Sequence, residues 1–277
     1  MRVEVATHAG VCYGVERALR LAGESAESGD RVRTLGPLIH NPQAVAALKE
    51  MGIEVAGCLD EVGDGTLIIR SHGVDPAIIA QAQEKGLDVV DATCPFVSAA
   101  HTCARDLNEK GYAVVIVGEE DHPEVEGIQA HAGGSALIVQ SAEDLPERLP
   151  ARNVGVVVQT TQSLARLEEV VAALLPRVAE LRVCNTICSA TAKRQLSAEE
   201  LARTVDVMIV VGGHNSGNTT RLAEICASVN PRTYHVETAD ELDPAWFEGA
   251  ESVGVTAGAS TPGVQMQNVI AAIEALD

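Results

Sequence analysis

The chain has 277 residues, 46% of them hydrophobic, and its 20 basic and 39 acidic residues give a formal net charge of −19. So acidic a chain disfavours extended contact with nucleic acid or with an anionic membrane surface. Because aromatic residues make up only 2% of the sequence, stacking platforms for bases are not expected either. We therefore expect partners that are small molecules or electron carriers.

Apolar runs typical of buried parallel strands recur along the whole chain. In chain order they cover residues 3–6, 32–35, 67–70, 88–91, 113–117, 137–140, 154–159, 205–211 and 253–256. The segments between them are rich in Ala, Leu and Glu, which is typical of helices. This alternation predicts an α/β fold in which helices cover parallel strands and functional loops gather at the carboxyl ends of the strands.

Three widely spaced cysteines, Cys12, Cys94 and Cys188, occur in similar contexts. Each closes an apolar run and opens a segment with a helical pattern, and these segments are 15–21, 97–107 and 191–202. A thiolate at such a turn is stabilised by the positive end of the helix dipole and by backbone N–H groups. Taken singly, each cysteine is explained as well by half-buried packing. Together, three thiolates suit an iron–sulfur cluster that keeps one iron open.

The repeated context also predicts three related α/β units. We expect them at residues 13–94, 95–184 and 185–277, with the third unit completed by a strand in residues 1–12. Three quasi-equivalent units around an axis would bring their cysteines to one central point.

The cysteine count and the absence of a targeting pattern bear on the compartment. No apolar stretch approaches the roughly 18 residues of a membrane span, and the first residues are typical of a strand, not of a signal peptide. Seven cysteines without a secretory signal favour thiol or metal chemistry in a reducing compartment. We therefore expect a cytoplasmic protein. Four cysteines are expected to pack in the core or on helix faces: Cys58, Cys103, Cys184 and Cys226.

Loops rich in Gly, Pro, Ser and Asn follow five of the predicted strands: residues 39–42, 70–73, 121–127, 212–221 and 256–262. Such loops present backbone N–H groups to phosphate oxygens, and Ser, Asn and His side chains add directed hydrogen bonds. Together the loops predict a diphosphate pocket. Singly, a turn or helix cap explains residues 212–218 as well, and His40, His72 and His122 are explained as well by buried core histidines. No nucleotide-binding motif occurs in the sequence.

Two carboxylates, Glu124 and Glu126, lie close together in the loop that begins with His122. One of them is a candidate proton source, because a dry site beside a negative cluster raises the pKa of a carboxyl group. Residues 159–161 end another predicted strand, where the Thr160 hydroxyl can relay a proton or hold a substrate alcohol. A plain strand-end cap explains this threonine equally well.

With these motifs the chain resembles the 4-hydroxy-3-methylbut-2-enyl diphosphate reductases, the family that completes the methylerythritol phosphate route to isoprenoids. The likeness runs from end to end and rests on nine motifs in the same order, at residues 10–15, 39–42, 71–73, 91–95, 122–127, 159–161, 187–191, 215–218 and 257–260. Gly217 departs from the commonest pattern, where serine is frequent, and this removes one possible phosphate donor.

The resemblance implies a trefoil of three α/β units around a [4Fe–4S] cluster held by Cys12, Cys94 and Cys188. It implies that the open iron binds the allylic hydroxyl of the substrate, that Glu124 donates a proton and that Thr160 supports the hydroxyl network. His122 is expected to serve both catalysis and substrate binding. The diphosphate would be held by His40, His72, His122, Ser216, Asn218 and Ser260.

The implied reaction is a reductive dehydroxylation by two electrons and two protons, giving isopentenyl diphosphate, dimethylallyl diphosphate and water. Ferredoxin or flavodoxin would donate the electrons, and neither nucleic acid nor a membrane is an expected partner. One alternative is a non-redox iron–sulfur hydro-lyase, which needs no electron donor. Another is a zinc or redox-thiol protein that binds an anionic metabolite without turnover, although zinc sites usually draw closely spaced cysteine pairs.

Overall fold

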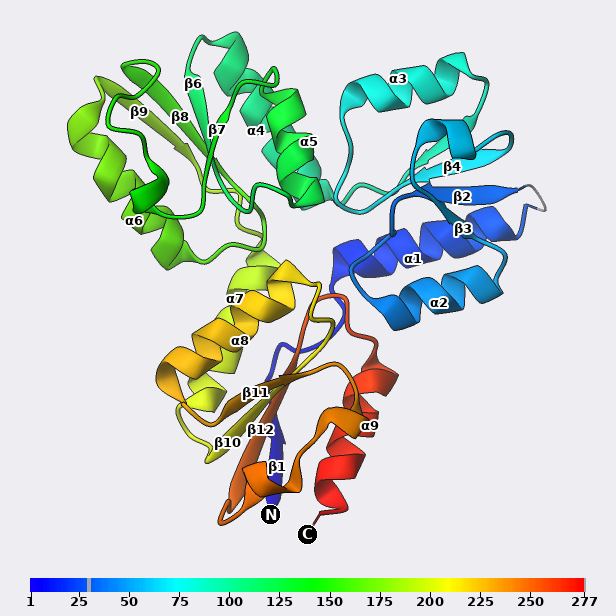
Figure 1. Cartoon of the computed structure of the whole chain (residues 1–277), viewed down its shortest axis with the longest axis vertical. Helices are drawn as coiled ribbons and strands as arrows, with labels where there is room; N and C mark the ends of the chain where they lie inside the picture. The colour runs from blue at the N-terminus through cyan, green and yellow to red at the C-terminus, as the bar shows by residue number, and fades with distance from the viewer. Residues whose placement is uncertain (29–30, 277) are drawn as a thin grey trace. The chain divides into compact units, whose positions relative to one another are not determined.

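The computed structural model describes residues 1–28 and 31–276, and within them the strands form three four-stranded parallel sheets (Figure 1). The first sheet has the order β3-β2-β4-β5. Its strands are β2 (Val32–Leu35), β3 (Glu54–Ala56), β4 (Thr66–Ile69) and β5 (Asp88–Asp91). The helices of this part of the chain are α1 (Tyr13–Ala26), α2 (Pro42–Glu50) and α3 (Pro76–Glu84).

The second sheet has the order β7-β6-β8-β9. Its strands are β6 (Ala113–Val117), β7 (Leu137–Val139), β8 (Asn153–Val158) and β9 (Glu180–Cys184). Its helices are α4 (Pro95–Glu109), α5 (Pro123–His131) and α6 (Leu164–Leu174). Short 3₁₀ helices follow β7 at η2 (Ala142–Asp144) and α6 at η3 (Leu175–Arg177). In the first sheet, a further 3₁₀ helix, η1 (Leu59–Glu61), lies between β3 and β4.

The third sheet has the order β1-β12-β10-β11 and joins the two ends of the chain. Its strands are β1 (Arg2–Val5), β10 (Val207–Val211), β11 (Thr233–Val236) and β12 (Ser252–Ala257). Its helices are α7 (Ser189–Ala202), α8 (Gly217–Val229) and α9 (Gly263–Glu274), with 3₁₀ turns η4 (Ala239–Glu241) and η5 (Pro244–Phe247). The parallel pairing of β1 with β12 runs from Arg2 opposite Ser252 to Val5 opposite Val255.

The three sheets share one topology. In the first two sheets the first and third strands in chain order are central, the second strand forms one edge and the fourth forms the other. In the third sheet β10, β11 and β12 take the first three of these positions, and the fourth is taken by β1, which corresponds to β5 in the first sheet and β9 in the second. The prediction of three related α/β units is therefore confirmed. The boundaries 13–94, 95–184 and 185–277 stay a prediction. By compactness the chain divides into unit 1 (Met1–Glu16, His40–Ala46 and Ser189–Asp277) and unit 2 (Arg17–Ile39 and Ala47–Cys188).

Alternating side chains of each central strand build two cores, one on either face of the sheet. In β10, Val207, Ile209 and Val211 pack with Val269 and Ile273 of α9. The intervening Met208 and Val210 pack with residues of α7 and α8. Both faces of these parallel strands are buried, so their sequences are continuous apolar runs and not alternating ones.

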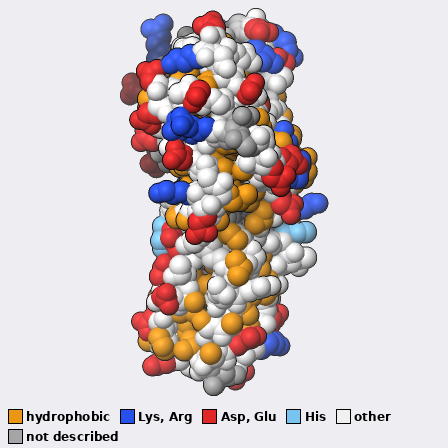
Figure 2. Space-filling model, turned by 90° about the vertical axis from the view of Figure 1, so that its right-hand side faces the viewer, with side chains coloured by type: hydrophobic (Ala, Val, Ile, Leu, Met, Phe, Trp, Pro, Cys, Tyr) orange, Lys and Arg blue, Asp and Glu red, His pale blue; other side chains and the backbone are white. Residues whose placement is uncertain are grey.

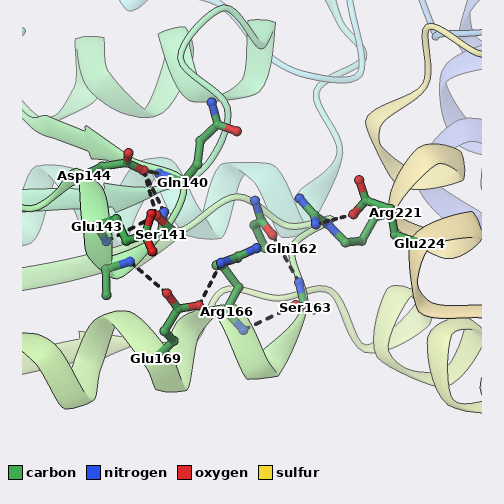
Figure 3. A network of polar contacts seen from close by, with 11 residues as sticks. Gln140, Ser141, Glu143, Asp144, Gln162, Ser163, Arg166, Glu169, Arg221 and Glu224 are labelled. Atoms are coloured by element: carbon green, nitrogen blue, oxygen red, sulfur yellow. Dashed lines mark hydrogen bonds and ion pairs between the residues drawn. The ribbon is translucent and has the colours of Figure 1, made fainter. Parts of the chain in front are cut away.

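The helix ends of the second sheet are fixed by polar side chains (Figure 3). The Ser163 hydroxyl accepts a hydrogen bond from the Arg166 N–H at 3.3 Å and so caps the start of α6. Glu169 on the same helix binds both Arg166 and the Ala142 N–H, which connects α6 to η2. Backbone N–H groups at the start of η2 hold the pKa of Asp144 below its usual value. These bonds satisfy donors that a helix start leaves unpaired.

The surface carries charges of both signs, and Figure 2 shows acidic and basic side chains interspersed over one face. Within the described residues, none of the helices has the length and apolar character needed to cross a membrane.

Candidate functional site

The three cysteines lie where the sequence predicts them, directly before helices. Cys12 precedes α1, Cys94 caps α4 and Cys188 precedes α7. The backbone N–H of each donates to a carbonyl in the loop after the neighbouring strand of its own sheet, β12, β4 or β8. The acceptors are Ala259 at 3.0 Å for Cys12, Ser71 at 2.9 Å for Cys94 and Thr160 at 3.0 Å for Cys188. The same backbone constraint thus occurs in all three repeats.

None of the three cysteines forms a disulfide within the described residues, and all three are half-buried. Cys12 belongs to unit 1, and Cys94 and Cys188 belong to unit 2. Within residues 1–28 and 31–276, no three His, Cys, Asp or Glu side chains stand together as a ready-made metal-ion site. The donor set nevertheless fits an iron–sulfur cluster, because it consists of soft thiolate ligands at helix starts.

Glu124 is a buried acid in the first turn of α5. Glu124 is only 2% exposed. Both of its carboxylate oxygens accept hydrogen bonds from Thr160. The Thr160 N–H donates to Oε1 at 2.6 Å and the Thr160 hydroxyl donates to Oε2 at 2.9 Å. Burial raises the pKa of Glu124 to about 7, although the two bonds from Thr160 lower it and the charge of Glu119 raises it. The group is therefore poised to exchange a proton near neutral pH.

Glu126, the other candidate acid, lies in a different environment. Its side chain is 60% exposed and pairs with Arg70 at 3.6 Å. Because α5 begins at Pro123, the two glutamates lie on different faces of a helix and not side by side on an extended strand. The geometry selects Glu124 as the candidate acid.

Two of the predicted histidines lie together in unit 2. The rings of His72 and His122 meet edge to face with their centroids 5.6 Å apart. His122 is the N-cap of α5, and its Nδ1 accepts the Glu124 N–H at 3.1 Å. In the neutral ring this bond leaves the proton on Nε2.

Unit 1 holds the other predicted ligands of an anion. The Ser260 hydroxyl donates to the backbone carbonyl of His40 at 3.0 Å. Ser216 caps α8 by accepting the Thr219 N–H. The buried Nδ2 of Asn218 makes no hydrogen bond within the described residues. A buried amide donor without an acceptor, at the start of a helix, fits an anionic ligand.

Comparison with known proteins agrees with the motifs. The family model described as LytB protein matches residues 3–274. The chain belongs to the LytB family. A curated relative from Pelobacter propionicus, a 4-hydroxy-3-methylbut-2-enyl diphosphate reductase, is 56% identical over 263 residues, which cover 95% of this chain and 94% of the relative. The enzyme of the same name from Geobacter sulfurreducens is 52% identical over 277 residues, covering 100% and 98% of the two chains.

Two solved structures share the fold of this LytB chain. One is an (E)-4-hydroxy-3-methyl-but-2-enyl diphosphate reductase described as the terminal enzyme of the non-mevalonate pathway. It is 47% identical, with a TM-score of 0.73, and the match covers 99% of this chain and 100% of the other. The second is the E-1-hydroxy-2-methyl-but-2-enyl-4-diphosphate reductase of Plasmodium falciparum. It is 26% identical, with a TM-score of 0.92, over 98% of this chain and 87% of the other.

Two arginines of the LytB chain hold the loops before two of the cysteines, and the sequence gives only a weak sign of this. Arg17 on α1 donates to the carbonyls of Thr93 at 3.2 Å and Asp91 at 3.3 Å, just before Cys94. Arg194 on α7 donates to the Gly10 carbonyl at 2.7 Å, two residues before Cys12. Only the spacing of each arginine after its own cysteine, about one and a half helical turns, is a signal, and it is a weak one.

Three of the four remaining cysteines pack as expected, and Cys58 does not. Cys226 is buried in the core beneath α7 and α8, and Cys103 and Cys184 pack against the core of the second sheet. The expectation for Cys58 is wrong, because this residue is exposed. It stands in the extended conformation directly before η1, where the chain leaves the sheet.

Proposed function

We propose that the protein is a 4-hydroxy-3-methylbut-2-enyl diphosphate reductase. It removes the allylic hydroxyl of this diphosphate with two electrons and two protons and releases isopentenyl diphosphate, dimethylallyl diphosphate and water. The relatives that carry this name match almost the whole chain. The observation that carries the proposal is the position of Thr160, whose N–H and hydroxyl hold the acid Glu124 and whose carbonyl holds the N–H of Cys188.

The cofactor of this proposal is a [4Fe–4S] cluster with Cys12, Cys94 and Cys188 as its protein ligands. When bound, the cluster supplies the electrons and a Lewis-acidic iron with an open coordination position. The chain supports it in two ways. The cysteines lie at the starts of three helices, where the helix dipole favours negative charge, and Arg17 and Arg194 anchor the loops that precede two of the cysteines.

The diphosphate is held, in this proposal, by imidazole, hydroxyl and amide donors rather than by a cage of lysines and arginines. The six side chains come from the segments that follow the carboxyl ends of strands, five from loops or helix caps and Asn218 from the first turn of α8: His40, His72, His122, Ser216, Asn218 and Ser260. The buried amide of Asn218, which has no acceptor within the described residues, offers a hydrogen-bond donor. Such directed donors bind a diphosphate even on a chain of net charge −19.

Glu124 serves as the proton donor. A carboxyl whose pKa is near 7 is protonated in an appreciable fraction of molecules at neutral pH. It can therefore protonate the hydroxyl oxygen as the C–O bond breaks, so that water leaves instead of hydroxide. Thr160 fixes both oxygens of the carboxyl group and so directs its proton. His122 fixes the helix turn that carries Glu124, because it accepts the Glu124 N–H.

The electron donor is proposed to be a ferredoxin or flavodoxin, since the reaction consumes single electrons from a carrier. The compartment is proposed to be the cytoplasm, in agreement with cysteines that form no disulfide within the described residues.

The first experiment is an anaerobic purification followed by measurement of iron, acid-labile sulfide and turnover. About four irons per chain and conversion of 4-hydroxy-3-methylbut-2-enyl diphosphate with a reduced viologen would support the reductase. A cluster that dehydrates or hydrates substrates without electrons would favour a hydro-lyase. A protein that binds no iron would contradict the proposal.

Glu124→Gln tests the acid. The amide keeps the size of the side chain but cannot donate an acidic proton, so we expect turnover to fall by about a hundredfold or more while iron content is unchanged. Glu126→Gln is the matched control, because Glu126 is exposed on the same helix. Near-normal turnover of the Glu124 variant would remove this residue from the role.

A further inference from the structure

A cavity of 370 Å³ opens on unit 1 beside Cys12. The loop that joins β1 to α1 forms one wall, and the first turns of α7 form the other. Cys12 itself lines the cavity, so any group that this thiolate binds would lie at its wall. The function proposed above does not use this cavity for substrate.

The cavity is cationic on a strongly acidic chain. Its lining includes the cationic side chains of Lys193 and Arg194 and contains no Asp or Glu among the described residues. The chain as a whole carries 39 acidic residues against 20 basic ones. An acidic partner is repelled by most of this surface and attracted where positive side chains gather, over a distance of about 10 Å at moderate salt.

Internal hydrogen bonds hold the shape of the cavity. Arg194 is 5% exposed and fixes the Gly10 carbonyl at 2.7 Å, while the His8 N–H donates to the Ser197 hydroxyl at 3.3 Å. These two bonds connect the loop before Cys12 to α7. The wall of the cavity is therefore preorganised, which reduces the conformational entropy lost on binding.

The rim of the cavity combines apolar and positive side chains. Tyr13, which lines the cavity, is 62% exposed at the start of α1, and Leu196 on α7, which lies outside the lining, is 58% exposed. Leu196 lies three residues after the exposed Lys193 and hence on the same face of the helix. An exposed aromatic and an aliphatic side chain next to a cation are typical of a protein interface, because they add buried apolar area to charge attraction.

We propose that this cavity and its rim, defined by His8, Tyr13, Lys193 and Leu196, are the docking surface for an acidic electron-carrier protein. The inference rests on the proposed function, since it places the carrier beside a cluster ligand. In each encounter the reduced carrier would give up one electron, which the cluster held by Cys12, Cys94 and Cys188 would accept. Two such encounters supply the two electrons of the reaction. With two protons they balance it: one C–O bond breaks, one C–H bond forms and one water is released.

The test compares Lys193→Glu with Lys49→Glu, an equal change of net charge at an exposed position on α2. The probe is an acidic [2Fe–2S] ferredoxin, and its binding to the anaerobic holoenzyme is measured by calorimetry at low and at physiological ionic strength. We expect Lys193→Glu to weaken binding at low salt by about fivefold and Lys49→Glu to have little effect. Turnover driven by ferredoxin should fall in parallel, and turnover driven by a reduced viologen should not.

The outcomes separate this inference from the proposed function. If viologen drives turnover but the two lysine variants bind ferredoxin equally, the docking surface is wrong and the reductase stands. If the wild-type holoenzyme does not bind ferredoxin at low salt, the docking surface is wrong as well. If the holoenzyme does not reduce the substrate with viologen, the proposed function fails together with the inference that rests on it.

Discussion

At Glu124, burial and hydrogen bonding act on one carboxyl group in opposite directions. Removal from water raises its pKa, and the two bonds from Thr160 stabilise the charged form and lower it. The balance leaves the pKa at about 7. A carboxyl buried without these bonds would stay protonated at neutral pH and would be slow to give up its proton, while an exposed one would already have lost it.

Thr160→Val tests this balance. The variant keeps the backbone N–H bond but removes the hydroxyl bond, so the pKa of Glu124 should rise further. Because the protonated acid is the active form, turnover should fall as pH rises through about 7 in the wild type. In the variant this falling limb should move to higher pH, with a maximal rate about tenfold lower. Thr161→Val is the control, and an unmoved limb in the pH–rate profile of Thr160→Val would contradict the account.

The same carboxyl predicts how stability depends on pH. Its folded-state pKa lies above its ordinary value of 4.5, so the folded protein holds the proton more tightly than the unfolded chain does. The stability that this group contributes is present below pH 4.5 and is lost as pH rises through about 7. The loss amounts to about 3 kcal/mol, an upper figure for one buried group. Chemical denaturation of cluster-free wild type and Glu124→Gln at several pH values should show this slope only in the wild type.

At the scale of elements, the central strands were predictable and three edge strands were not. The apolar runs gave β2, β5 and β6 with their observed bounds. No apolar run marks β3, β9 or β11 in the sequence, because these edge strands of parallel sheets are partly exposed. The run 205–211 begins two residues early, since Asp206 turns to bind the N–H groups of residues 251 and 252.

The candidate site, too, was predictable from the sequence only in part. Positions of the cysteines at helix starts followed from local patterns. The contacts of Arg17 and Arg194 with the loops before Cys94 and Cys12 join segments distant in sequence, so no local pattern predicts them. The burial of Glu124 also depends on packing of α5 against the second sheet, which the sequence alone does not specify.

A buried histidine connects elements of unit 2 and explains two glycines in the motifs. His101 on α4 is buried, and a Cβ on Gly73 would lie 2.4 Å from its Cε1. A Cβ on Gly127 would lie 2.9 Å from its Nε2. The imidazole thus fills the space that the missing side chains leave beside the His72 loop and beside α5, which carries Glu124.

Gly73→Ala should therefore destabilise the fold more than a glycine substitution in open space. Gly86→Ala is the matched control, because both residues have a positive φ, 73° and 77°, and nothing lies within 4 Å of a Cβ on Gly86. Both variants place a side chain on a left-handed backbone and share that cost. The clash with His101 should lower the free energy of unfolding of Gly73→Ala by about 2 kcal/mol more. Denaturation curves measure the difference. Equal stabilities, or no recovery when His101→Ala is combined with Gly73→Ala, would count against the packing argument.

At the scale of the whole molecule, one topology is used three times and the chain closes on itself through β1. The cysteine of each repeat follows an edge strand, β1, β5 or β9, and its N–H binds the loop of the adjoining strand. The repeats have diverged in their acids and anion ligands, since Glu124 occurs in one and Asn218 occupies the same helix position in another. What all three retain is the cysteine and its backbone bond.

This equivalence predicts that the three cysteines are equally necessary for the cofactor. Cys12→Ala, Cys94→Ala and Cys188→Ala should each lose most of the iron, from about four atoms per chain, because two thiolates do not retain such a cluster. Cys58→Ala, at an exposed position, and Cys226→Ala, in the core, are controls that should keep it. Iron, sulfide and the visible absorption of anaerobic protein measure the effect, and circular dichroism checks that each variant is folded. A folded Cys94 variant with a full complement of iron would exclude the three-cysteine site, whatever the activity of the wild type.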